Sequence, residues 1–346
     1  MSIENIPIIS FFCGCGGFDL GFASTGFDVI LALDKDPVAV ESYNHNHRRK
    51  NACVGDLTKL TADKILEMCR ENDDRIPRGV IGGAPCQTYS NGNVHFDGTD
   101  SRHHLPRQYA ALLKEINAHC NLDFFVFENV KGMTQSRHRK EFAIIKRLFS
   151  RAGFHVFATI LDAADFGVAQ RRARVFLVGL NKKTYRGCKF EFPGRTSDAH
   201  LTVSDKLRGL PQPLYFSPGL TRENIPYHPN HWTMVPRSKR FTDGSLKKGK
   251  QKGRSFRILS WDKPSMTVAY GNREIHVHPT GKRRLSIYEA MQLQDLPKDY
   301  ELLGTLSDQV RQVSDAIPPA LGRALGMSIR SHVQGVRVRP NAAAYN

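Results

Sequence analysis

The sequence has no run of about 18 apolar residues, which is the length that a membrane-spanning helix needs. Its beginning, MSIENIPIISFF, has no basic stretch before an apolar core, so we expect a first strand there and not a targeting peptide. The seven cysteines are an odd number scattered over 346 residues, which is unlike a disulfide framework. These absences predict a protein of a reducing cytoplasm without a membrane span.

Two common kinds of ligand site also lack their sequence signature. Cys13 and Cys15 form a C-x-C pair, but no second pair of Cys or His at ligand spacing accompanies it, so we expect no metal site. The pattern G-x-x-x-x-G-K-[ST] is missing, which excludes a phosphate-binding loop of the Walker type.

Positive charge is abundant: 50 Lys and Arg stand against 33 Asp and Glu, for a formal net charge of +17. An excess of this size favours a polyanionic partner, although a generic basic surface is an alternative. The charge is concentrated in PRSKRFTDGSLKKGKQKGRSFR (236–257), which holds nine Lys and Arg and one Asp. We interpret this stretch as part of a basic face; the alternative for 243–254 is a flexible, solvated linker.

The first half of the chain alternates apolar, β-rich runs with amphipathic segments. The expected strands are 6–13, 29–34, 79–84, 123–129, 155–161 and 174–180. One expected helix begins at Pro37, a second is marked by Leu105, Tyr109, Leu112, Leu113 and Ile116, and a third by Phe142, Ile145, Leu148 and Phe149 before Gly153. This alternation predicts an α/β fold with a doubly wound, mostly parallel sheet, whose ligands bind beyond the C-terminal strand ends.

The character of the sequence changes twice. Residues 181–282 are rich in Pro, Gly, Lys, Arg and His and have only short periodic runs. Helical patterning returns from about 283, in SIYEAMQLQ and in the closing segment that begins PPALG. We therefore expect a catalytic and cofactor-binding domain at 1–180, a smaller irregular domain at 181–282, and a return to the first domain at 283–346.

Three glycines follow the first expected strand, in FFCGCGGFDLGF (11–22). Gly14, Gly16 and Gly17 allow a tight turn and a close approach of the backbone to a ligand. The next strand ends in Asp34, at the spacing of a carboxylate that binds ribose hydroxyls, and Asp56 follows in GDL. Together they predict a cofactor that contains adenosine.

Cys86 lies in GGAPCQTYSNGN (82–93), a turn that follows an expected strand end. A lone cysteine is more often buried and structural, but ligand sites gather at strand ends, and a thiolate is a strong nucleophile. We predict that Cys86 is a nucleophile and that residues 87–104 form a closing lid.

Glu128 ends the apolar strand FFVFENV (124–130), where an unpaired carboxylate would be expensive to bury. It is either a cap of the next element or an acid with a raised pKa that contacts a ring nitrogen. Arg172 and Arg174, in FGVAQRRARVFLVG (166–179), are two residues apart and so share one strand face. A basic surface edge is one interpretation, and a pair facing a carboxylate and a base carbonyl is the other.

These motifs, in this order, resemble those of the DNA (cytosine-5) methyltransferase family from Phe12 to Pro319. The resemblance rests on the glycine loop, Pro85-Cys86-Gln87, Glu128-Asn129-Val130, Gln170 with Arg172 and Arg174, Arg284-Leu285-Ser286 with Glu289 and Gln294, and VSDAIPP (313–319). The departures from the family pattern are Lys35, Ala84, Ala169, Tyr288, Ser314, Asp315 and Asp295. None of these departures removes a side chain that the family's methyl-transfer reaction would use. Asp315, however, adds a negative charge near the methionine portion of S-adenosylmethionine, the cofactor that the resemblance implies.

The resemblance implies a Rossmann-like domain that uses S-adenosylmethionine, and a smaller, β-containing target-recognition domain. The implied cofactor-binding residues are Phe12, Gly14, Gly16, Gly17, Asp34, Asp56, Leu57, Pro85, Asp315 and Ala316. The implied catalytic residues are Cys86, which adds to C6 of an extruded cytosine, Glu128, which contacts N3, Arg172, which orients both, and Arg174, which holds the base carbonyl. None of these assignments follows from composition or spacing alone.

Double-stranded DNA is the implied partner, with Gln87 and Ser90 near the target base. We expect flexible Lys247, Lys248, Lys250 and Lys252 to bind phosphates, and more rigid groups such as Arg237, Arg240 or His231 to read bases. A monomer in the bacterial cytoplasm, with a restriction endonuclease that acts on the same site, completes the expectation. The alternatives are an RNA cytosine-5 methyltransferase, whose Cys-Phe-Thr signature is missing, and a catalytically silent DNA-binding homologue.

Overall fold

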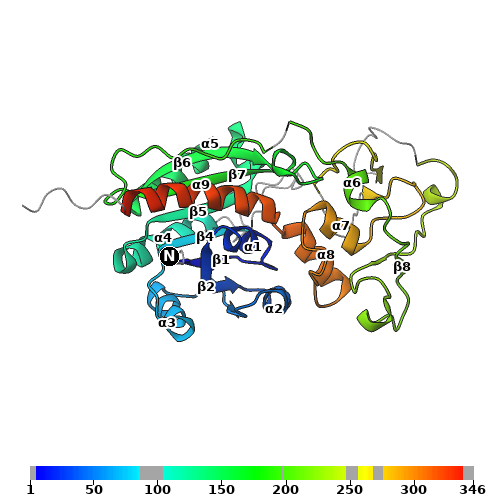
Figure 1. The fold of residues 1–346 in the computed structure, drawn as a ribbon, viewed down its shortest axis with the longest axis horizontal. Helices are drawn as coiled ribbons and strands as arrows, with labels where there is room; N and C mark the ends of the chain where they lie inside the picture. The colour runs from blue at the N-terminus through cyan, green and yellow to red at the C-terminus, as the bar shows by residue number, and fades with distance from the viewer. Residues whose placement is uncertain (1–4, 86–103, 197, 247–255, 268–275, 338–346) are drawn as a thin grey trace, which may run out of the picture.

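The computed structural model of the chain describes residues 5–85, 104–196, 198–246, 256–267 and 276–337. Its centre is a seven-stranded sheet of order β3-β2-β1-β4-β5-β7-β6 (Figure 1). The strands are β1 (Ile6–Phe11), β2 (Phe27–Asp34), β3 (Ala52–Val54), β4 (Gly79–Gly83), β5 (Phe124–Val130), β6 (Phe154–Asp162) and β7 (Ala173–Asn181). All neighbours pair in parallel except β7, which is antiparallel to β5 and β6, so the predicted mostly parallel sheet is confirmed.

Helices cover both faces of this sheet. One face packs against α1 (Gly17–Ala23), α2 (Pro37–Asn46) and α9 (Pro319–Arg337), and the other against α3 (Ala62–Asn72), α4 (Leu105–Cys120) and α5 (Arg139–Arg151). The predicted helix start at Pro37 is confirmed, because the Asp36 side chain caps α2 by accepting from the backbone N–H of Val38. The apolar residues that mark α4 are all buried, as an amphipathic helix on a sheet requires.

Helices α1 and α9 bring the beginning and the end of the described chain into backbone contact (Figure 1). A side chain at Gly21 would overlap the carbonyl oxygen of Pro319, and one at Gly322 would overlap that of Phe18. Phe18 and Phe22 of α1 are buried in the same contact. Glycine is therefore required on both helices for their axes to approach this closely.

The other elements of the described residues are short. They are α6 (Val203–Leu207), α7 (Ile287–Leu293), α8 (Leu306–Asp315), β8 (Leu214–Tyr215), β9 (Trp232–Thr233), β10 (Arg257–Ile258), β11 (His276–Val277) and the 3-10 turns η2 (Lys131–Thr134), η3 (Ser136–His138), η4 (Ala163–Phe166), η5 (Arg222–Asn224) and η6 (Lys239–Phe241). Helices α7 and α8 lie between the sheet and the end of the molecule that carries α6 and β8 (Figure 1). The domain limits at 180 and 282 stay predictions. No helix in the described ranges is long and apolar enough to cross a membrane.

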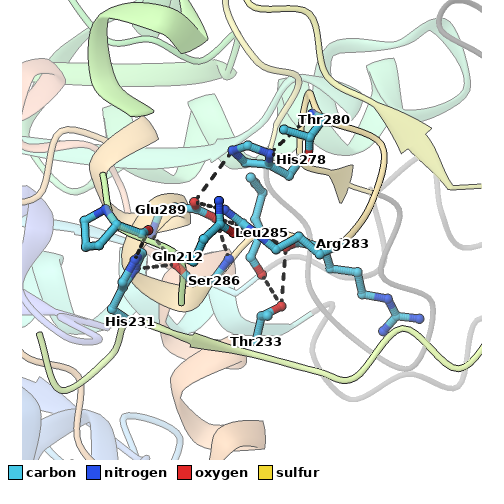
Figure 2. Close-up of polar contacts among 11 residues, drawn as sticks. Gln212, His231, Thr233, His278, Thr280, Arg283, Leu285, Ser286 and Glu289 are labelled. Atoms are coloured by element: carbon cyan, nitrogen blue, oxygen red, sulfur yellow. Dashed lines mark hydrogen bonds and ion pairs between the residues drawn. The ribbon is translucent and has the colours of Figure 1, made fainter. Parts of the chain in front are cut away.

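A buried ion pair helps to connect α7 to the end of the molecule that carries α6 and β8 (Figure 2). Arg283 donates through both terminal nitrogens to the two carboxylate oxygens of Glu289, at 2.8 and 2.7 Å. Both side chains are at most 4% exposed. Glu289 also accepts from the backbone N–H of Ser286 at 2.8 Å, and Arg283 donates to Gln212 at 3.1 Å. The carboxylate thus joins the N-terminal cap of α7 to Arg283, and Arg283 in turn joins it to the segment that holds Gln212.

His231 belongs to the same network (Figure 2). One ring nitrogen lies 3.0 Å from the Ser286 hydroxyl and the other 2.9 Å from the Pro211 carbonyl oxygen. The ring is buried, and burial lowers the pKa of the imidazole. The expectation that His231 reads bases is therefore wrong, because neither nitrogen is free to meet a base edge.

We predict that Glu289→Gln destabilises the fold by about 3 to 5 kcal/mol, the range for leaving one partner of a buried ion pair without its counter-charge. Urea unfolding followed by circular dichroism measures the loss. Glu67→Gln, which removes a solvent-exposed pair with Lys64 at 2.9 Å, is the control and should leave the unfolding midpoint unchanged. A loss as small for Glu289 as for Glu67 would contradict the role of the pair.

A second buried carboxyl, that of Asp19, lies in the first turn of α1, next to β1. Asp19 is 1% exposed and accepts a hydrogen bond from the Ser10 hydroxyl at 2.8 Å. Burial raises its pKa to about 7, although the neighbouring hydroxyls of Ser10 and Tyr43 act in the opposite direction. The folded protein therefore binds a proton at Asp19 that the unfolded chain releases near pH 4.

We predict that Asp19→Asn gains stability relative to the wild type as the pH rises. The raised pKa makes the wild type lose stability between about pH 4 and pH 7, whereas an amide does not titrate. The advantage of the variant should grow by about 2 to 3 kcal/mol between pH 5 and pH 8, measured by urea unfolding. Ser10→Ala keeps the carboxyl but removes a hydrogen bond that lowers its pKa, so its loss of stability with rising pH should remain and extend to higher pH than in the wild type. Parallel curves for Asp19→Asn and the wild type would rule the explanation out.

Candidate active site

The C-terminal ends of β1, β2, β4 and β5 meet at one edge of the sheet, and most of the predicted site residues follow these ends. The glycine loop follows β1, Asp34 ends β2, Pro85 follows β4, and Glu128 lies near the end of β5. Strand β7 runs the other way, so its beginning brings Arg172 and Arg174 to the same edge. Cys86, Gln87 and Ser90 lie outside the described residues, directly after the exposed Pro85.

The glycine loop adopts the backbone conformation for which its glycines were predicted. Gly14 and Gly16 have φ angles of 54° and 91°, and Phe12, which is half-buried, has 54°. A side chain at Gly16 would overlap the ring of His47, and one at Gly17 would lie 2.6 Å from the carbonyl oxygen of Ile317. The loop is thus held between α2 and the segment that precedes α9.

Asp34 ties this loop to the second strand. Its carboxylate accepts from the backbone N–H of Gly14 and of Asp36, each at 2.9 Å, and burial raises its pKa. The side chain is half-buried, and two carboxylate oxygens have capacity for more than two donors. Asp34 therefore retains acceptor capacity for the hydroxyls of a ribose.

The other predicted cofactor contacts surround the same place. Asp56 is partly exposed and accepts from the Thr58 backbone and hydroxyl, while Leu57 is buried beside it. Ala316 is buried, whereas Asp315 is exposed to solvent even though the surrounding protein raises the pKa of its carboxyl. The residues present fit an adenosine-containing group.

Glu128 forms an ion pair with Arg174, whose Nε lies 3.0 Å from the carboxylate. Glu128 is 7% exposed, and a side chain at Gly83 would lie 2.5 Å from its Oε2 atom, so the glycine in β4 makes room for the carboxyl. Burial raises the pKa of Glu128, and the charges of Arg174 and Arg172 oppose that rise. A carboxyl in this setting holds a proton more readily than a free glutamic acid.

Arg172 has a different set of partners from the predicted one. Its Nη2 donates to the backbone carbonyls of Ser314 at 2.8 Å and Asp315 at 3.3 Å, at the end of α8. The side chain is 1% exposed, and its Nε and Nη1 have no acceptor in the described part of the chain. Burial lowers its pKa to about 9. In this structure Arg174, not Arg172, contacts Glu128.

Asn129 has a role that the sequence reasoning did not assign. Its amide nitrogen donates to the carbonyl oxygen of Ala84 at 3.2 Å, and its oxygen accepts from the backbone N–H of Val130. It thus joins the end of β5 to the segment that leads into Cys86. Its place beside Glu128 in the Glu-Asn-Val motif was the available signal.

The predicted DNA-reading residues are only partly described. Arg237 is exposed, and the guanidinium of Arg240 lies 5.6 Å from the ring centre of Phe256. Lys247, Lys248, Lys250 and Lys252 lie outside the described residues. Within the described ranges, no cluster of three His, Cys, Asp or Glu side chains is arranged to hold a metal ion.

Comparison with known proteins covers nearly the whole chain. The type II methyltransferase M.NmeDI of Neisseria meningitidis serogroup C is 31% identical over 94% of this chain and 84% of its own length. M.FnuDI of Fusobacterium nucleatum is 30% identical over 94% of each chain. Two solved structures share the fold. One is a protein encoded in an E. coli prophage, with a TM-score of 0.77 and 23% identity over 95% of this chain and 100% of its own. The other is the S. pombe Dnmt2 methyltransferase, with a TM-score of 0.62 and 16% identity over 96% of this chain and 99% of its own.

The family described as C-5 cytosine-specific DNA methylase matches residues 6–331. That range includes the glycine loop, the Glu128–Arg174 pair and the segment around Ala316. The chain therefore belongs to the C-5 cytosine-specific DNA methylase family and is a DNA cytosine-5 methyltransferase.

Proposed function

We propose that the protein recognises a DNA sequence, extrudes a cytosine from the duplex and methylates it with Cys86 as the nucleophile. The observation that supports this most is the meeting of Pro85, Glu128 and Arg174 at one sheet edge, beside the glycine loop. A pyrimidine edge is unreachable inside a duplex, so the base must be extruded, at a cost of a few kcal/mol.

The proposed chemistry begins with the thiolate of Cys86, which forms a bond to C6 of the cytosine. The carboxyl of Glu128 hydrogen-bonds or protonates N3, so the electrons of the C5–C6 double bond move to C5 and make it nucleophilic. After methylation, C5 gives its proton to a water molecule, the electrons of that C–H bond re-form the C5–C6 double bond, and the Cys86–C6 bond breaks to release the thiolate. A proton that N3 has taken returns to Glu128. The buried position and raised pKa of Glu128 suit a group that must be protonated at this point.

Arg174 and Arg172 have different proposed roles. Arg174 holds Glu128 in position and is close enough to the edge to meet the base carbonyl. Arg172 fastens the end of α8 to β7, and its two unused donors face no acceptor of the described chain. Such donors are costly to leave unpaired in a buried place, which favours a partner supplied by the bound substrate or by the segment containing Cys86.

S-adenosylmethionine, when bound, supplies an electrophilic methyl group. We propose that the glycine loop and Asp34 hold its ribose end, that Asp56, Leu57 and Pro85 line the adenine, and that Asp315 and Ala316 face the methionine portion. The hydrogen bond from the Gly14 N–H to Asp34 holds the loop in position before the cofactor arrives.

We also infer the biological setting from the relatives, which are named as type II methyltransferases. A restriction endonuclease that cuts the same sequence is the proposed partner, and residues 181–282 are the proposed target-recognition domain of a monomeric enzyme. Residues 87–104 are the proposed lid.

We predict that Cys86→Ser abolishes methyl transfer and leaves duplex binding largely intact, because a serine hydroxyl remains protonated near pH 7. Transfer of tritium from labelled S-adenosylmethionine to duplex DNA, with tRNA as the competing substrate, measures activity. Duplex DNA with 5-fluorocytosine at the target should trap the wild type as an adduct stable in denaturing gels. The same adduct with Cys86→Ser would overturn the assignment, and transfer to tRNA alone would overturn the substrate.

We predict that Glu128→Gln lowers single-turnover methylation at least about tenfold, within the usual range for the loss of an acid or base group. An amide can still donate a hydrogen bond to the base, but it is too weak an acid to transfer a proton. The rate should fall at all pH values between 6 and 8, while S-adenosylmethionine binding stays at the wild-type level. An unchanged rate would mean that Glu128 is only a structural partner of Arg174.

A further inference from the structure

A group of exposed, positively charged side chains follows directly after β5, the strand that holds Glu128. Lys131 lies in η2, Arg137 in η3, and Arg139 and Lys140 in the first turn of α5. All four side chains are exposed. We call them the edge cations.

The charge around them is one-sided. Residues 131–151 hold seven Lys and Arg and a single acid, Glu141. Glu141 is already occupied, because Arg107 of α4 donates to both of its oxygens at 3.0 and 2.9 Å. None of the edge cations forms an ion pair with an acid of the described chain, whereas a solvated surface normally mixes both signs.

Helix α3 provides a comparison on the same face of the sheet. It carries Lys64 and Arg70 against Asp63, Glu67 and Glu71, and Lys64 pairs with Glu67 at 2.9 Å. Helix α3 therefore carries both signs of charge. The segment formed by η2, η3 and the start of α5 differs from it in carrying cations whose neighbours in sequence include a single acid.

The edge cations lie at the edge of the sheet that carries the candidate active site, and not at the opposite edge of the sheet. Lys131 is three residues after Glu128, so their Cα atoms are at most about 10 Å apart. The contact between Arg107 and Glu141 places the first turns of α4 and α5 side by side, where the chain returns from the segment containing Cys86. The last turn of α5 is at the far edge, because Lys182, just after β7, donates to the Ser150 carbonyl.

We propose that the edge cations bind backbone phosphates of the duplex that flanks the extruded cytosine, as an anchor separate from residues 181–282. The inference rests on the proposed function, since it needs the target base at Glu128. A duplex carries one negative charge per about 1.7 Å of its axis, so a group of flexible cations beside the extruded base meets phosphates regardless of sequence. The anchor would hold the flanking duplex while the base is unstacked.

The α5 helix itself offers a matched control. Arg147 and Arg151 are exposed arginines of the same helix, but they lie about 12 to 18 Å further from the active-site edge than Arg139, at 1.5 Å per residue. The edge variant is Arg137→Gln with Arg139→Gln, and the control is Arg147→Gln with Arg151→Gln. Each removes two positive charges and touches no residue of the catalytic or cofactor site.

The experiment measures binding of a 30-base-pair duplex of mixed sequence over a series of salt concentrations. The edge variant should bind at least about tenfold more weakly at low salt, and its salt slope should fall by about two, one for each lost contact. The control variant should keep the wild-type slope. S-adenosylmethionine binding by calorimetry should be equal in all three proteins, which shows that the fold is intact.

Two results would overturn the inference: no change in the edge variant, or an equal loss in both variants. An equal loss would mean that the charges act at long range and not by contact. The proposed function fails separately, if the wild type transfers no methyl group to duplex DNA. An active wild type with an unaffected edge variant would therefore refute the anchor alone.

Discussion

The close approach of α1 and α9 is the constraint on which the site depends. Gly21 and Gly322 bring the two backbones together at a distance that no side chain permits. The same contact sets Ile317 against Gly17, and so places the last motif of the chain on the first. The site at the sheet edge thus combines residues from both ends of the chain.

The electrostatics of the catalytic edge follow from that assembly. The carboxyl of Glu128 and the guanidinium of Arg172 are buried and that of Arg174 is partly buried, and of the two arginines Arg174 forms the ion pair with Glu128. Arg172 uses the end of α8 instead, where the carbonyls of a helix terminus carry a partial negative charge. Helix α8 packs against α7 and α2, so the charge balance at Glu128 depends on a segment far along the chain.

Much of the fold could be predicted because the central strands are buried on both faces and therefore read as continuous apolar runs. Strand β3 has three residues, too few to form such a run, and it was not predicted. Helix α8 was also not predicted, since LSDQVRQVSD has few apolar residues; its signal was the capping box of Thr305 and Asp308. The spacing of Arg172 and Arg174 indicated a shared strand face, but it could not indicate their partners. The acceptor of Arg172 is 142 residues away in sequence, and no local pattern records such a contact.

The pairing of α1 with α9 also means that, during synthesis, α1 is made long before the helix that it packs against. Phe18 and Phe22 leave the ribosome early, whereas the helix that covers them begins about 300 residues later. At roughly 5 to 20 residues per second, the apolar face of α1 waits about 15 to 60 seconds for its partner. During that interval, one face of the sheet has α1 and α2 but lacks α9. A chaperone that shields this face, or slow pairing after release, is a consequence of placing two halves of one site at opposite ends of a polypeptide.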